Sequence, residues 1–238
     1  MSPFLLTTKP VDDTPAVRVP ITRRASLSEI AIVLGVPTVI FLSSSIRWRL
    51  LHHGTVIFTD TRLLMTLGLE AAITAVLLPY LVRRGWNPLT VNPAPEGKDI
   101  LRGLLVWVAI LPALYVSVLV LYALVPDTVA FLRARQFSGS ISPIVVVMAS
   151  LLNPIFEEFL WLGYAIPAIT SRLGLGVACA ASIILRVAVH LYQGKLALVS
   201  VLPIAIVLTW YYVRTGRLWP TVVAHVIVDA LGLSRLAA

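Results

Sequence analysis

Ionisable and amide side chains occur in small groups within three long apolar runs of the carboxyl-terminal half. They are Asn153, Glu157 and Glu158 in the first run, Arg186 and His190 in the second, and His225 and Asp229 in the third. Each run has two of these residues four positions apart, which on a helix share one face. Burying an ionisable group at mid-membrane costs about 2.5–3.5 kcal/mol on insertion scales, so such groups face a protein interior or a water-filled cavity. We therefore predict that three helices enclose one polar pocket.

Carboxylates and imidazoles around one water molecule form a general-base system. We expect Glu157 with His190 to activate water. We expect His225 with Asp229 to support the oxyanion that forms at a peptide carbonyl. An ionised Asp229 cannot donate a hydrogen bond, so it is either protonated or serves by orienting His225. Glu158 belongs to the same predicted catalytic group.

Other uses of these residues remain open. Two histidines and a carboxylate match the ligands of hydrolytic zinc sites, and Glu157, His190 and His225 would then hold the metal. The sequence has no His-Glu-x-x-His pattern on one helix, so we favour water activation without a required cofactor, with zinc as the alternative. A structural polar network, or the proton pathway of a proton-coupled transporter, would use the same residue types.

Long apolar segments must position these side chains. Hydrophobic residues make up 58% of the 238 residues and charged residues 13%, with a mean hydropathy of +0.92. The composition predicts an all-α, polytopic transmembrane helix bundle of about seven spans, within a range of six to eight. The predicted spans are 29–46, 63–82, 101–125, 141–170, 173–192, 196–213 and 218–236.

The chain divides into two parts. Residues 1–28 contain Asp12, Asp13 and several prolines without an apolar signal-peptide core, which predicts a flexible amino-terminal tail. Residues 29–238 are predicted to form a single transmembrane helical domain, with the chemical motifs in 141–236. Pro154 is expected to kink its helix one turn before the acidic pair.

Charge and cysteine content narrow the partners. The net charge is +8, but the basic residues lie between apolar runs, where they anchor helices, so we expect no nucleic-acid partner. The expected partners are the lipid bilayer and a membrane-associated peptide or protein substrate. Lys and Arg in alternate connections favour a cytoplasmic amino terminus in a multi-pass protein of a bacterial plasma membrane. A single cysteine, Cys179, excludes an intrachain disulfide.

Taken together and in order, the motifs resemble those of the CPBP family, also called Abi or CAAX prenyl protease-like. The chain has EEFLWLG at 157–163, RVAVH at 186–190 and HVIVD at 225–229. That family has a double glutamate followed by an Arg-Gly step, then a Phe-x-x-x-His helix and a His-x-x-x-Asn/Asp helix. The resemblance covers roughly residues 140–236. It implies an intramembrane endopeptidase, glutamate-type or metal-dependent, that cleaves membrane-associated peptides near their ends. Family links to immunity and scaffolding leave a non-catalytic membrane protein as the alternative.

Two positions depart from the family pattern. Leu162 stands where the family has arginine, and Arg186 stands where it has phenylalanine. We hypothesise that these are one event, in which Arg186 on the next helix pairs with Glu158 in place of the missing arginine. Asn153 and Arg186 are thus predicted to support the site. Glu70, a lone acid in the second span, is interpreted as structural.

Overall fold

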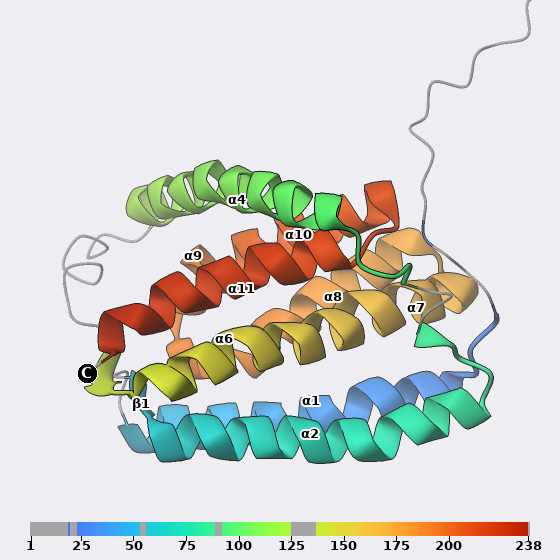
Figure 1. Ribbon diagram of the computed structural model, residues 1–238, viewed down its shortest axis with the longest axis horizontal. Helices are drawn as coiled ribbons and strands as arrows, with labels where there is room; N and C mark the ends of the chain where they lie inside the picture. The colour runs from blue at the N-terminus through green and yellow to red at the C-terminus, as the bar shows by residue number, and fades with distance from the viewer. Residues whose placement is uncertain (1–18, 20–22, 53–55, 89–91, 125–136, 238) are drawn as a thin grey trace, which may run out of the picture.

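The computed structural model describes residues 19, 23–52, 56–88, 92–124 and 137–237, and most of them are helical (Figure 1). The helices are α1 (Leu27–His52), α2 (Asp60–Arg83), α4 (Gly97–Leu124), α6 (Pro143–Glu158), α7 (Ala165–Leu173), α8 (Leu175–Val189), α9 (Lys195–Val199), α10 (Val201–Thr215) and α11 (Trp219–Leu233). Two strands, one π-helical turn and two 3-10 turns complete the described chain: β1 (Val56–Thr59), β2 (Phe137–Ser140), η1 (Phe159–Tyr164), η2 (Leu191–Gln193) and η3 (Ser234–Leu236). The predicted all-α class is confirmed.

Each of the seven predicted apolar runs coincides with helical structure. Within the described residues, five segments are long and apolar enough to cross a membrane: Leu27–Leu51, Asp60–Arg83, Gly97–Leu124, Pro143–Leu173 and Lys195–Thr215. Helices α8 and α11 are shorter, with 15 residues each. Most of the predicted tail, 1–18 and 20–22, lies outside the described residues. Helix α1 begins at Leu27, so only the last few tail positions are seen.

The helices form a bundle in which α11 and α6 lie between α4 on one side and α1 with α2 on the other (Figure 1). Helix α11 packs against both α4 and α6, and α6 also packs against α2. Behind them, α10 contacts α4 and α8, while α7 contacts α8. The three helices that carry the polar motifs are therefore central elements of the bundle.

Apolar side chains cover both the interior and the outside of the bundle. Ile110, Leu162, Ile166 and Leu208 are fully buried in the main core. On the outside, large apolar residues of the long helices are more than half exposed; among them are Val39, Val76, Val116 and Val147. An exterior of this kind is favourable where lipid, rather than water, is the solvent.

A short parallel sheet closes one end of the bundle, on the left in Figure 1. We call it the strand end; it comprises β1, β2 and η3. Val56 pairs with Phe137 and Thr59 with Ser140, which ties the α1–α2 connection to the segment before α6. Gly139 has a φ of +123°, and a Cβ there would collide with the Phe58 carbonyl oxygen, so only glycine fits. The sequence did not predict these strands.

Helix α2 starts directly at this sheet. The Thr59 hydroxyl accepts a hydrogen bond from the Arg62 backbone N–H at 3.3 Å, which caps the helix. Asp60 in the first turn accepts a hydrogen bond from the Ser142 backbone N–H at 2.8 Å. These contacts fix the direction in which α2 leaves the strand end, and so fix the side chains of its first turns.

Candidate active site

The two adjacent glutamates of α6 point to different surroundings. Glu158 is fully buried between helices, whereas Glu157 lines a cavity and is 8% exposed. Directly after them the backbone changes to the π-helical turn η1. Such turns are rare and often lie at functional sites. Pro154 lies inside α6, as the sequence predicted. The departure from regular α-helix in this segment is the π turn η1, which begins after Glu158.

Glu158 is the centre of a buried network that joins three helices. Arg186 of α8 donates two hydrogen bonds to its carboxylate, Nη1 to Oε1 at 2.7 Å and Nη2 to Oε2 at 3.0 Å. His225 of α11 approaches the same carboxylate, with Nδ1 2.8 Å from Oε1. The predicted pairing of Arg186 with Glu158 is therefore present as a two-pronged ion pair.

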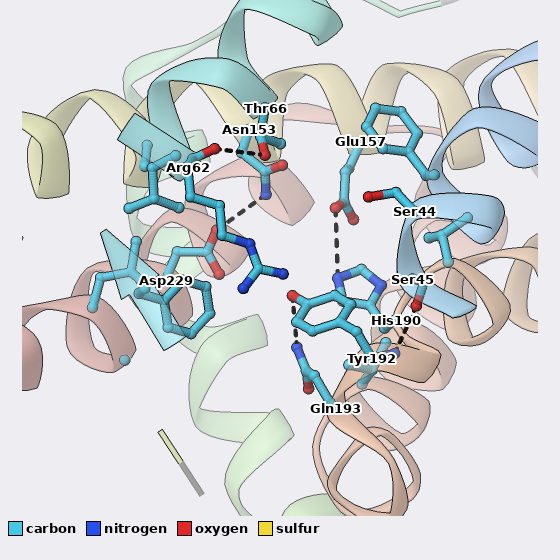
Figure 2. Close-up of a pocket in the computed structure, with 18 of the residues that line it drawn as sticks. Ser44, Ser45, Arg62, Thr66, Asn153, Glu157, His190, Tyr192, Gln193 and Asp229 are labelled. Carbon is cyan, nitrogen blue, oxygen red and sulfur yellow. Dashed lines mark hydrogen bonds and ion pairs between the residues drawn. The ribbon is translucent and has the colours of Figure 1, made fainter. Parts of the chain in front are cut away.

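His190 lies at the point where α8 ends. Its Nδ1 is 2.8 Å from the backbone carbonyl oxygen of Arg186. A carbonyl can only accept, so Nδ1 carries a hydrogen, and in the neutral ring Nε2 is the free acceptor. That Nε2 faces Glu157, 3.8 Å from Oε1, as Figure 2 shows. The other oxygen of Glu157, Oε2, is buried and has no hydrogen-bond partner among the described residues.

The second histidine has an acid on each side. While Nδ1 of His225 contacts Glu158, its Nε2 lies 3.6 Å from Oδ1 of Asp229, four residues later on α11. The amide of Asn153 donates to Oδ2 of Asp229 at 3.3 Å (Figure 2). The structure thus brings together every residue in which the sequence predicted site chemistry, from α6, α8 and α11.

One cavity of about 970 Å³ connects these groups. Its polar lining includes Asn153, Glu157, Arg186, His190, His225 and Asp229. The cavity extends to the strand end, where Trp48, Arg62 and Arg235 line it. Its size suits a ligand comparable to a short peptide.

Residues 139–231 match a family model described as type II CAAX prenyl endopeptidase Rce1-like. The segment is similar to that family, and the name Rce1-like domain is used below for residues 139–231 in this sense. The resemblance predicted from the three motifs is confirmed. Comparisons with curated proteins and with solved structures gave no match. The long apolar helices indicate an integral membrane protein, and its residues 139–231 are similar to a protease family.

The Rce1-like domain contains all of the predicted site residues but does not enclose the cavity alone. Helices α1 and α2, which precede it, supply one wall, with Ser45, Trp48, Arg62 and Glu70 among the lining residues. Glu70 is 5% exposed, and its Oε2 has no hydrogen-bond partner in the described part of the chain. The sequence showed Glu70 as an outlier only.

Arg62 and Tyr192 also line the cavity. The sequence did not predict this position for Arg62. Tyr192 follows His190 in η2, and its backbone N–H donates to the Ser45 hydroxyl at 2.6 Å. In the sequence, Arg62 directly precedes a predicted apolar span, a position typical of a basic residue that anchors a helix at the membrane interface. No spacing rule connects it with residues of the Rce1-like domain.

The donors of the predicted zinc alternative are Glu157, His190 and His225. Among the described residues, no group of three or more His, Cys, Asp or Glu side chains is arranged to hold a metal ion. Both nitrogens of His225 face acids, whereas Nδ1 of His190 contacts a backbone carbonyl and Nε2 remains an acceptor. The zinc alternative stays a prediction, and no step below involves a metal.

Proposed function

We propose that the protein is an intramembrane endopeptidase that hydrolyses a peptide bond of a membrane-associated peptide or protein. The observation that supports it most directly is the pair formed by Glu157 and His190 in the cavity. Their facing atoms are 3.8 Å apart, too far for a direct hydrogen bond, and both retain acceptor capacity. A water about 2.8 Å from each atom would satisfy both.

Such a water would be held by two acceptors, the Glu157 carboxylate and the His190 Nε2. The water donates a hydrogen to each acceptor, so its lone pairs are free to attack a carbonyl carbon in the cavity. In this step the water oxygen bonds to the carbonyl carbon, and the proton passes to Glu157. When the tetrahedral intermediate collapses, the carbon–nitrogen bond breaks and Glu157 returns the proton to the leaving amine. The products are a new carboxyl group and a new amine.

His225 is placed to act on the oxygen of the attacked carbonyl. With a hydrogen on each ring nitrogen, His225 would donate from Nδ1 to Glu158 and direct Nε2–H into the cavity. A positioned donor of this kind stabilises a developing oxyanion. Asp229 lies beside Nε2 and would orient the ring, while Asn153 holds Asp229.

The Glu158 network supplies rigidity to this arrangement. The carboxylate is fully buried, and Arg186 neutralises its charge with two hydrogen bonds. Because Glu158, Arg186 and His225 come from three helices, the network fixes the distance between the water-activating pair and the oxyanion donor. Buried, fully paired groups of this kind are costly to displace.

The experiment that tests the proposal is cleavage of a reporter peptide library by purified protein in detergent. Glu157→Gln keeps the shape of the side chain and removes its basicity, so cleavage should fall by at least about 100-fold. Glu96→Gln is the matched control, because Glu96 is an exposed glutamate outside the cavity, and it should retain activity. Full activity in Glu157→Gln contradicts the proposal. Loss on chelation with recovery on zinc addition would contradict the metal-free mechanism.

Two other functions make different predictions. The first is a non-catalytic immunity or scaffold protein, which the family links leave open and which the missing arginine at Leu162 would favour if nothing replaced it. Arg186 supplies the guanidinium to Glu158 instead, which removes that argument for an inactive site. A transporter would have discontinuous helices, and α8 does stop at His190. Substrate flux in liposomes without peptide cleavage would favour transport.

A further inference from the structure

Arg62 places a guanidinium in the cavity from outside the Rce1-like domain. It lies in the first turn of α2, next to the strand end, and its side chain extends into the cavity between Asp229 and Tyr192 (Figure 2). The residue is partly buried rather than freely exposed. It is therefore a cation that belongs to the cavity wall.

The guanidinium is held in position by its surroundings. Nη1 of Arg62 donates to the backbone carbonyl of Ile57 in β1 at 2.8 Å. The central carbon lies 3.4 Å from the centre of the Trp48 ring, a stacked cation–π geometry, and 5.8 Å from that of Tyr192. An arginine fixed in this way loses little conformational freedom when it binds a ligand.

No acid in the described part of the chain forms an ion pair with this cation. Within the described residues, no carboxylate oxygen lies within 4.0 Å of the Arg62 guanidinium. The nearby acids have other contacts, since Glu158 pairs with Arg186 and Asp229 accepts from Asn153. Only one of the five N–H donors is used by Ile57, so a planar pair of donors remains for an anion.

A second donor lies beside it. The Tyr192 hydroxyl oxygen accepts a hydrogen bond from the Gln193 side-chain amide at 3.1 Å. Its own hydrogen is therefore available for another acceptor. Figure 2 shows the Tyr192 hydroxyl directed to the same central space as Arg62. A fork of two N–H groups with one O–H donor matches a carboxylate.

We propose that Arg62, assisted by Tyr192, is the residue that binds the free α-carboxylate of the substrate. This rests on the proposed function. The cavity that Arg62 shares with Glu157 has a volume of about 970 Å³, which accommodates a short peptide segment between anchor and scissile bond. Arg62 is a specificity-determining residue in this scheme and takes no part in bond breaking.

The test uses matched reporter peptides that differ only at the carboxyl terminus, as free acid or as amide. For the wild type, kcat/KM should be about 10- to 100-fold higher for the acid, the value of a charge-assisted hydrogen bond. Arg62→Gln should reduce this ratio to nearly one, and Arg62→Lys should give an intermediate ratio. Because both peptides are compared on one preparation, partial misfolding cancels from the ratio.

Arg47→Gln is the matched control, since Arg47 lines the same cavity near the strand end but is exposed. It should keep the wild-type ratio. Equal cleavage of acid and amide by the wild type, or an unchanged ratio in Arg62→Gln, overturns the proposal while leaving the protease function intact. A variant that instead loses only its dependence on anionic phospholipid would assign Arg62 to a lipid phosphate.

A binding measurement distinguishes failure of the proposed protease function from failure of the proposed carboxylate site. If the wild type cleaves no peptide, displacement of a fluorescent peptide from the protein still compares the acid with the amide. Preferential displacement by the acid, lost in Arg62→Gln, would support the carboxylate site without catalysis. Equal displacement by both forms would refute it.

Discussion

Removal of the guanidinium from the buried network is the sharpest test of the site architecture. Arg186→Met keeps most of the side-chain volume but removes the guanidinium from the Glu158 carboxylate, which keeps only its contact with His225. Both side chains are almost completely buried, with 2% and 0% exposed, so water cannot replace the lost hydrogen bonds. Breaking a buried ion pair by removing one partner costs about 3–5 kcal/mol. On the calibration of domains of this size, that corresponds to a loss of roughly 6–20 °C in Tm.

A second substitution isolates the electrostatic contribution. In Glu158→Gln with Arg186→Met no unpaired charge remains, so the double variant should be more stable than Arg186→Met alone. The free energy of unfolding can be followed by tryptophan fluorescence as dodecyl sulfate is added to detergent micelles. Arg214→Met, an exposed arginine at the end of α10, is the control and should change stability by less than about 0.5 kcal/mol.

Two results would refute this reasoning. One is a cost below about 1 kcal/mol for Arg186→Met, which would mean that Glu158 is neutral or hydrated in the folded protein. The other is a double variant no more stable than Arg186→Met, which would locate the damage in packing and not in the stranded charge.

Three further predictions follow from contacts described above. Arg186→Leu should abolish peptide cleavage, and adding Leu162→Arg should restore part of it; a double variant as inactive as the single one would contradict the relocation hypothesis. Asp229→Asn should stay within about tenfold of wild-type kcat/KM, because an amide can still contact His225. Asp229→Ala should lose about 100-fold in kcat/KM. Wild-type kcat/KM in both variants would show that Asp229 takes no part in the site. Arg217→Leu should lower the free energy of unfolding by about 1–3 kcal/mol, since Asp99 loses two hydrogen bonds, and should leave cleavage unchanged.

That last effect should not vary with pH in the working range. The hydrogen bonds from Arg217 to Asp99 raise the pKa of the guanidinium above its ordinary value, so Arg217 is charged at every pH at which the protein is handled. A stability difference that disappeared between pH 6 and pH 9 would point to another cause.

Sequence patterns were sufficient for the bundle and for the convergence of its polar groups. Membrane helices are long apolar runs, so their approximate limits can be read directly. The four-residue spacings in α6 and α11 show which side chains share a face, and polar faces in lipid turn towards one another. Even the contact between Arg186 and Glu158 followed from two departures from a family pattern.

Other features could not be read from the sequence because they depend on how helices are rotated and placed. The β1–β2 pair joins segments far apart in the chain, and neither has a strong strand pattern. Arg62 looked like one of several interfacial arginines, and its entry into the cavity depends on the cap of α2 at Thr59. The early end of α8 at His190 is a tertiary feature, since the predicted run continued to residue 192.

The π turn after the acidic pair gives α6 and α7 independent phases within one membrane crossing. Each residue of an α-helix advances the side-chain direction by about 100°. If Phe159–Tyr164 formed a regular α-helix with the same number of residues, α7 would be turned by about that amount relative to Glu157. Either the catalytic carboxylate or the fully enclosed surface of α7 would then face the wrong neighbour. The wide turn at Phe159–Tyr164 is therefore what allows both surfaces to face their present neighbours.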